Sequence, residues 1–109
     1  MAGFEVSTEV AFLDSSYRLL RDGVETVEEG TITRAAVYPR RVVEAALRKG
    51  AAAIVLAHNH PNERLTPSDH DKVLTRAVVL AAETVDVTVV DHLIVSASDT
   101  FSFRKSGLL

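Results

Sequence analysis

Hydrophobic and polar positions change their spacing along the chain, and these changes predict strands first and helices later. Residues 6–13 loosely alternate between apolar and polar, which is typical of a strand with one buried face. A second extended run begins at Leu19, is interrupted at Asp22-Gly23 and continues through residues 24–28. Residues 31–37 are expected to form a third strand, so the first third of the chain is interpreted as an antiparallel meander.

Two helices are predicted in the remainder, separated by a buried strand. Pro39 fits the first position of a helix that Gly50 ends, and apolar residues between them recur at helical spacing. The apolar run 51–57 has the length and flanks of a strand buried on both faces. The second helix is expected to follow an N-cap at Thr66 and to end near Glu83.

Two more strands are predicted, at residues 87–95 and 101–103. The element order is then a meander, a helix, a strand, a helix and two strands, which favours an α/β sandwich with a mixed sheet. With 109 residues and neither repeat nor linker, the chain is expected to form a single domain over residues 1–109.

The amino-acid composition limits the binding partners and the cellular compartment that we expect for the protein. The 12 basic and 15 acidic residues give a net charge of −3, which argues against nucleic acid as the main partner. The chain has no cysteine, which excludes disulfides and thiolate zinc sites and leads us to expect a reducing cytoplasm. No apolar run reaches the roughly 18–20 residues of a membrane span, and residues 1–5 do not begin a signal peptide, so no membrane partner is expected.

All 4 histidines lie between residues 58 and 92, and two of them form a candidate metal site. His58 and His60 are two apart at the end of a predicted strand, so both imidazoles project to the same side. Asp71 follows in the next helix and shares a helix face with Ser68, three residues earlier. If that helix starts beside the strand end, two imidazoles and a carboxylate converge on a zinc ion and leave its fourth position open for water.

Such a site has the parts of a hydrolase. Zinc lowers the pKa of bound water to roughly 7, and Ser68 is placed to donate to a developing oxyanion. A carboxylate base is needed as well, and the candidates in the second strand are Glu25, Glu28 and Glu29. A simpler interpretation stays open at this point, because histidines two apart recur by chance and an aspartate in the second turn of a helix is often only solvated.

Other polar residues have structural interpretations that we favour. Asp69 is expected to complete a capping box with Thr66, and His70 is expected to lie at the surface. Asp91-His92 could orient a metal ligand, but a satisfied pair in the core is the favoured interpretation. A set of basic residues suggests a nucleic-acid face, although solvated charges near the end of a helix explain it more simply. These are Arg34, Arg40, Arg41, Arg48 and Lys49.

The candidate site resembles the JAMM motif of JAB/MPN metallopeptidases, which reads His58-x-His60, seven residues, Ser68, two residues and Asp71 in this chain. Over almost the whole chain, the sequence is more closely similar to the carboxy-terminal domain of RadC-type proteins. The segments that carry this similarity are Leu13-Asp14-Ser15, Gly30-Thr31-Ile32, Pro39-Arg40, Ala57-His58-Asn59-His60-Pro61, Pro67-Ser68-x-x-Asp71, Asp91-His92 and Phe101-Ser102-Phe103.

The resemblance implies a three-layer α/β/α sandwich of the cytidine-deaminase-like (JAB/MPN) type, with a zinc-dependent peptidase or isopeptidase site for a protein or peptide substrate. It implies that His58, His60 and Asp71 hold one zinc ion per chain and that Ser68 stabilises the tetrahedral intermediate. The glutamate of the family lies shortly before the Gly-Thr turn, which selects Glu25. Its implied role is to take a proton from water and pass it to the leaving amine.

The chain departs from the family pattern in three places. The His-Pro segment of RadC-type proteins usually continues with Ser-Gly, whereas Asn62-Glu63-Arg64-Leu65 follow here, so the loop beside the metal is expected to differ. The stretch 21–24 is longer than usual, which leaves the choice between Glu25 and its neighbours open. Full-length members carry an amino-terminal helix-hairpin-helix region that this sequence lacks, so a natural short form or an excised domain is expected.

Two other functions compete with hydrolysis. One is a DNA-associated accessory protein, for which the basic residues between 40 and 49 are the only sequence support. The other is an interaction module that a metal stabilises and that has no turnover. Exposed edge strands could pair with a substrate peptide or with a second copy of the chain, which would give a homodimer.

Overall fold

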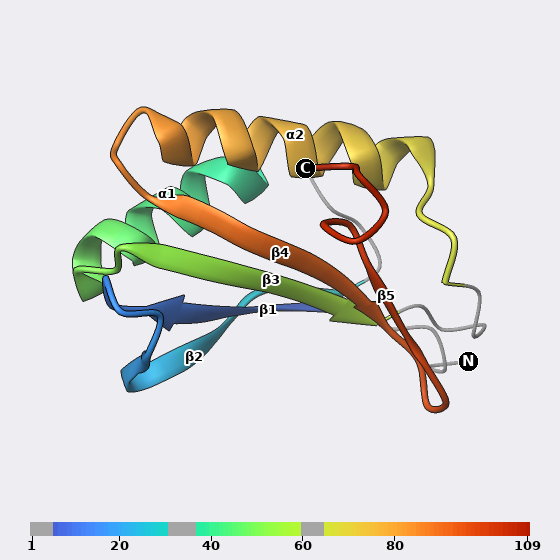
Figure 1. The fold of residues 1–109 in the computed structure, drawn as a ribbon, viewed down its shortest axis with the longest axis horizontal. Helices are drawn as coiled ribbons and strands as arrows, with labels where there is room; N and C mark the ends of the chain where they lie inside the picture. Colours follow the sequence, from blue (N-terminus) through green and yellow to red (C-terminus); the bar gives the residue numbers. More distant parts are fainter. Residues whose placement is uncertain (1–5, 31–36, 60–64) are drawn as a thin grey trace.

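The computed structural model describes residues 6–30, 37–59 and 65–109, which form one mixed five-stranded sheet and two helices (Figure 1). In chain order the elements are β1 (Val6–Leu13), β2 (Leu19–Gly30), α1 (Val37–Lys49), β3 (Ala53–Asn59), α2 (Asp69–Glu83), β4 (Thr88–Val95) and β5 (Thr100–Ser102). The strands lie in the order β2-β1-β3-β4-β5. β3 and β4 are parallel and the other neighbours are antiparallel, so the predicted α/β fold with a mixed sheet is confirmed.

The β1–β2 hairpin confirms the antiparallel start of the predicted meander. The interruption at Asp22-Gly23 is an irregularity inside β2, because residues 20–23 bulge out between the pairs Ala11–Val24 and Leu13–Leu19. Gly23 is required there, since a Cβ on it would lie 2.5 Å from a backbone carbonyl oxygen. The third predicted strand covered residues 31–37. Residues 31–36 lie outside the described residues, and Val37 is the first residue of α1.

The end of α1 follows the prediction, whereas its start differs by two residues. The helix begins two residues before Pro39, which therefore lies inside the first turn. Proline is tolerated there because N–H groups of the first turn have no carbonyl partner within the helix, so its missing N–H costs no helical hydrogen bond. Gly50 follows the last helical residue with a φ of +69°, which confirms it as the predicted stop.

The predicted cap of α2 is wrong by two residues. Ser68 is the N-cap rather than Thr66, and Asp71 rather than Asp69 completes the capping box. Both pairs fit the sequence pattern of a capping box. The backbone decides between them, because Ser68 has an extended conformation (φ −76°, ψ 166°) that a helix begun at Pro67 would not allow.

Both helices lie on the same face of the sheet (Figure 1). The strand residues on that face are fully buried in the core, whereas alternate residues such as Val55 and Ala57 on the opposite face are only half-buried. The described residues therefore build one sheet and one helical layer, and they do not supply the second helical layer of an α/β/α sandwich. Neither α1 nor α2 is long and apolar enough to cross a membrane.

The β3–α2–β4 unit determines where a site can lie. Because β3 and β4 are parallel, the helix that joins them runs back along the sheet and starts near the carboxyl end of β3. Ligand sites in open α/β sheets lie at this end of the strands. His58 is the sixth residue of β3 and so lies at the same end as the start of α2.

The core packing predicts a contrast between two leucines. Leu56 is fully buried under the helices, and Leu56→Ala is expected to lower the free energy of unfolding by about 2–5 kcal/mol through lost burial and a cavity. Leu47 in α1 is 57% exposed, so Leu47→Ala is the matched control and should change it by less than about 0.5 kcal/mol. Urea denaturation measures both, and equal effects would contradict this assignment of the core.

Candidate metal centre

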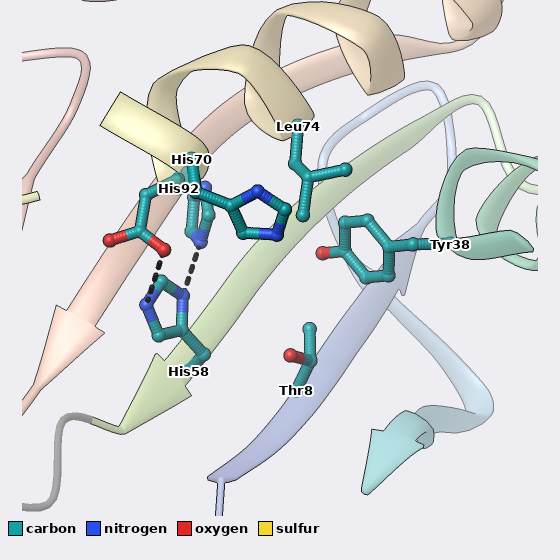
Figure 2. Close-up of a pocket in the computed structure, with 7 residues that line it drawn as sticks. Thr8, Tyr38, His58, His70, Leu74 and His92 are labelled. Carbon is teal, nitrogen blue, oxygen red and sulfur yellow. Dashed lines mark hydrogen bonds and ion pairs between the residues drawn. The ribbon is translucent and has the colours of Figure 1, made fainter. Parts of the chain in front are cut away.

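A small hollow of about 50 Å³ lies at the carboxyl end of β3, between the sheet and both helices (Figure 2). Its walls come from β1, α1, β3, α2 and β4. The lining residues are Thr8, Tyr38, His58, His70, Asp71, Leu74 and His92. Elements that are far apart in the sequence thus bring three histidines and one aspartate to a single place.

His58 and Asp71 face each other across this hollow. The Nε2 atom of His58 lies 3.6 Å from Oδ1 of Asp71, and the two side chains are 7% and 17% exposed. The other carboxylate oxygen, Oδ2, accepts a hydrogen bond of 2.8 Å from the backbone N–H of Ser68. The structure therefore brings together three of the residues selected from the sequence.

Ser68 is held in place by the same capping box. Its hydroxyl oxygen accepts a hydrogen bond of 3.0 Å from the backbone N–H of Asp71. This bond uses a lone pair and not the hydroxyl hydrogen, so capping the helix is compatible with donation to another group. The side chain is exposed at the start of α2, beside the hollow.

Two of the three predicted metal ligands, His58 and Asp71, are among the described residues. His60 lies outside the described residues, and among residues 6–30, 37–59 and 65–109 no three histidine or acidic side chains form a group that could hold a metal ion. The two ligand candidates that are described fit zinc in spacing. Two ligands of one tetrahedral zinc ion lie about 3.4 Å apart when each bond is about 2.0–2.2 Å, and Nε2 and Oδ1 are 3.6 Å apart. A neutral imidazole nitrogen and a carboxylate oxygen are also chemically suitable donors.

His92 of β4 contacts the other nitrogen of His58. Nδ1 of His58 and Nε2 of His92 are 2.8 Å apart, and Nδ1 of His92 lies 2.6 Å from the hydroxyl of Thr75 in α2. That hydroxyl donates a hydrogen bond of 2.7 Å to the backbone carbonyl of Asp71. The ring of His92 stacks on Phe103, with centroids 4.6 Å apart and planes inclined by 13°.

The carboxylate of Asp91 accepts a hydrogen bond of 2.7 Å from the backbone N–H of His92, but the two side chains do not form the core pair that the sequence suggested. The hydroxyl of Ser102 and the backbone N–H of Arg104 donate to the carboxylate of Asp91, which holds the turn after β5 against β4. His92 is 3% exposed and lines the hollow instead. Neighbouring residues of a strand project to opposite faces, so the two side chains serve different parts of the molecule.

Sequence reasoning missed two lining or supporting residues, and it predicted the exposure of a third but not its place at the hollow. Thr75 is 1% exposed, and its spacing to Val78 and Ala82 places it in the apolar stripe of α2, where a polar residue is a usable signal. Tyr38 is 3% exposed and points its hydroxyl into the hollow (Figure 2), which no pattern in the sequence indicates. His70 is exposed as expected, yet it also lines the hollow.

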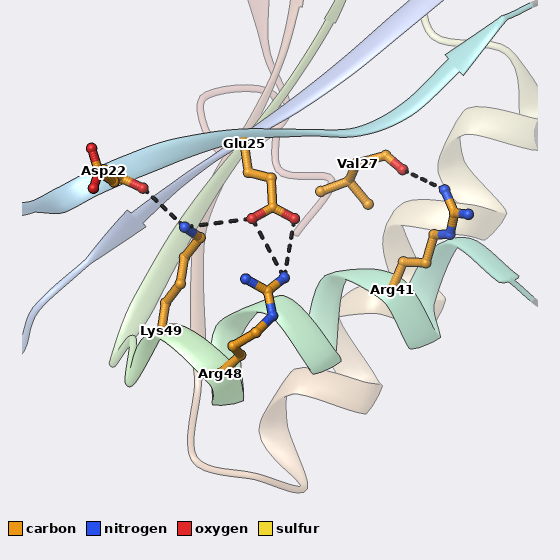
Figure 3. Close-up of polar contacts among 6 residues, drawn as sticks. All are labelled: Asp22, Glu25, Val27, Arg41, Arg48 and Lys49. Atoms are coloured by element: carbon orange, nitrogen blue, oxygen red, sulfur yellow. Dashed lines mark hydrogen bonds and ion pairs between the residues drawn. The ribbon is translucent and has the colours of Figure 1, made fainter.

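Glu25 is not brought to this hollow. Its carboxylate lies 3.2 Å from the guanidinium of Arg48 and 3.4 Å from the ammonium of Lys49, both at the end of α1 (Figure 3). The hydrogen bond from Arg48 is the main cause that lowers the pKa of the Glu25 carboxyl below its ordinary value of 4.5. Burial acts against it, and the charge of Arg48 and the contact with Lys49 lower the pKa further. A carboxylate held by two cations is a weaker proton acceptor.

Three basic side chains of α1 contact β2. Lys49 donates a hydrogen bond to the backbone carbonyl of Asp22, and Arg41 donates one to the carbonyl of Val27 (Figure 3). With Arg48 bound to Glu25, these contacts engage three of the side chains on which a nucleic-acid face would depend. The helix charges therefore help to attach α1 to the edge strand of the sheet.

The register of the sheet aligns another glutamate with His58, in the same row of residues paired across neighbouring strands. β1 pairs Thr8 with His58 on one side and with Glu28 on the other, whereas Glu25 shares its row with Val10 and Leu56. Two strand spacings of about 4.8 Å separate the Cα atoms of His58 and Glu28. The partners of Glu25 lie two residues away from Thr8 and His58 along β1 and β3, so Glu25 is nearer the opposite end of the sheet.

The fold and the candidate ligands define an α/β domain of the JAB type. The family model of the RadC-like JAB domain matches residues 6–108, and the chain belongs to this family. A UPF0758 protein of Burkholderia cenocepacia is 46% identical over 98 residues, which cover 90% of this chain and 37% of that protein. Another UPF0758 protein, from Pseudoalteromonas translucida, is 46% identical over 92% of this chain and 44% of its own length. The chain thus spans less than half the length of these curated relatives.

The Glu25–Arg48 contact predicts a pH-dependent contribution to stability. In a double-mutant cycle with Glu25→Gln and Arg48→Gln, the coupling energy is expected to be below about 1 kcal/mol at pH 7, because both groups are partly exposed. The pKa of Glu25 is lowered by folding, so this contribution is present above pH 4.5 and is lost as the pH falls through the lower folded value. Urea denaturation at several pH values measures it, and a coupling that grows on acidification would contradict the assignment.

Proposed function

We propose that this domain is a zinc-dependent hydrolase that cleaves amide bonds in protein or peptide substrates. The observation that carries the proposal is the approach of the His58 and Asp71 donor atoms at the carboxyl end of β3, in a chain of the RadC-like JAB family. His60 is proposed as the third ligand from the sequence motif. Zinc bound by three protein ligands activates water as a nucleophile at neutral pH and polarises a carbonyl group.

The residues of the chain would divide the remaining work. Ser68 would donate its hydroxyl hydrogen to the oxygen of the amide carbonyl, on which negative charge develops during attack. A glutamate of β2 would take a proton from the attacking water and give it to the leaving amine. The buried aromatic and aliphatic walls of the hollow, such as Tyr38 and Leu74, would limit access of bulk water.

We propose Glu28 as this base in place of Glu25. The support is the register, which gives Glu28 the row of His58 and Thr8, and the two cations that already bind Glu25. The amide substrate is proposed from the resemblance to JAMM metallopeptidases. A cytoplasmic location is proposed from the absence of cysteine.

Zinc binding provides the first test of this function. Protein purified without chelators is expected to bind about one zinc ion per chain through the proposed three-ligand site, measured by plasma mass spectrometry and by competition with a coloured chelator. Asp71→Asn keeps an oxygen that can accept the capping hydrogen bond but removes the charge, so zinc affinity should fall by more than the roughly 10–100-fold that loss of an outer partner costs.

Asp69→Asn is the matched control for this measurement. Asp69 is an exposed carboxylate in the same first turn of α2 and is not part of the hollow. Its replacement changes the helix N-terminus by the same charge, so zinc affinity should stay close to that of the wild type. A wild-type protein that binds no zinc, or equal losses in the two variants, would sink the proposed metal site.

The choice of base predicts different effects for two glutamates. Glu28→Gln is expected to abolish hydrolysis while zinc content is retained, because the base accepts a proton and is not a ligand. Glu25→Gln should leave turnover within a few-fold of the wild type and lower stability slightly. The measurement is cleavage of a degenerate peptide library, read by mass spectrometry, with zinc content determined on the same samples. Loss of cleavage in Glu25→Gln alone would return the role to Glu25.

A further inference from the structure

A chain of buried polar contacts leads away from the candidate ligand His58 into the core, and the proposed function does not use it. The chain runs from His58 through His92 to Thr75 and ends on the backbone carbonyl of Asp71. His92 and Thr75 are 3% and 1% exposed. Buried polar groups are costly unless they are satisfied in a definite arrangement, so the direction of each hydrogen bond in this chain can be worked out.

The direction follows from the number of hydrogens available. Thr75 has one hydroxyl hydrogen, and it is donated to the carbonyl of Asp71, which can only accept. Toward His92 the hydroxyl oxygen must therefore accept, so Nδ1 of His92 carries the hydrogen. In a neutral ring the other nitrogen is then an acceptor. Nε2 of His92 consequently accepts from Nδ1 of His58, which must carry a hydrogen as well.

The last step concerns the nitrogen of His58 that faces Asp71. With the hydrogen on Nδ1, the Nε2 atom of a neutral His58 presents a lone pair toward Oδ1 of Asp71, 3.6 Å away. This is the tautomer in which Nε2 can bind a metal ion, because a nitrogen that carries a hydrogen has no lone pair to donate. Metal-binding histidines usually have their tautomer fixed by a hydrogen bond from the other nitrogen.

We propose that Thr75 and His92 are positioning residues that hold His58 in the Nδ1–H tautomer and thereby prepare its Nε2 atom as a ligand. Thr75 acts through His92 and contacts neither the ligand nitrogen nor a substrate. Phe103 supports the relay, because its stacked ring fixes the plane of the His92 imidazole. The effect on zinc rests on the proposed function, whereas the tautomer of His58 is a property of the metal-free protein.

Thr75→Val tests the relay with a residue of nearly the same shape. It removes the acceptor for Nδ1–H of His92, and the hydrogen of His92 is expected to move to Nε2. His58 must then accept at Nδ1 and carry its own hydrogen on Nε2, where zinc would bind. Zinc affinity is expected to fall about 10–100-fold, as for other losses of an outer partner. Thr75→Ser keeps the hydroxyl and should restore both the tautomer and the affinity.

The main readout is the tautomer in the metal-free protein. Long-range proton–nitrogen correlation spectra of histidine-labelled protein distinguish Nδ1–H from Nε2–H. The wild type and Thr75→Ser are expected to show Nδ1–H for His58 and His92, and Thr75→Val should show Nε2–H for both. If Thr75→Val does not fold, His92→Phe replaces it, because Phe retains the ring stacked on Phe103 and removes the acceptor for His58.

The outcomes separate the relay from the proposed function. Nδ1–H on His58 in a wild-type protein that binds no zinc supports the relay and contradicts the proposed hydrolase. Nε2–H on His58 in the metal-free wild type overturns the relay. A folded Thr75→Val or His92→Phe variant with wild-type zinc affinity also overturns the relay. In that case the proposed metal site is not contradicted.

Discussion

The carboxylate of Asp71 serves both the cap of α2 and the candidate site, and the arrangement of that site depends on this division. One oxygen accepts from the backbone of Ser68 and completes the cap of α2, and the other faces the imidazole of His58 on β3. The capping bond satisfies the backbone N–H of the N-cap residue and stabilises the helix whether or not a cation is near. It also fixes the rotamer of the carboxylate. The second oxygen is therefore held in place before any metal binds, which lowers the entropy cost of binding.

This double use explains how the sequence could select Asp71 as a candidate ligand and still assign the capping box of its helix to other residues. The residues 66–71 contain two overlapping patterns of a capping box, and helix propensity does not distinguish Thr66 with Asp69 from Ser68 with Asp71. Local signals predicted a helix start within two residues, and the position of β3 predicted that His58 would lie beside it. The topology supplied the rest, since a parallel β3–α2–β4 unit brings the strand end and the helix start together.

The parts that the sequence did not predict depend on register and on contacts between distant elements. Counting back from Gly30 selected Glu25, whereas the proposal of Glu28 rests on irregularities in the β1–β2 pairing that determine which residue of β2 aligns with His58. A register shift of this kind leaves no pattern in the hydrophobic spacing. The role of His92 was open for the same reason, because its partner His58 is 34 residues away in the chain. Of these residues, only Thr75 could be recognised in the sequence, because it is a polar residue within the apolar stripe of α2.

The carboxy-terminal turn joins this network through two neighbouring residues of β4. Asp91 holds the turn through Ser102 and Arg104, and the turn carries Phe103, whose ring is fully buried against His92. The face of the sheet opposite the helices thus fixes a residue that supports the site on the helical face. Because polar contacts inside a protein reinforce one another only when every member is satisfied, loosening the turn and breaking the relay should have related effects on His58. The orientation of His58, the candidate ligand, thus depends on packing in the core as much as on the residues that would touch a metal ion.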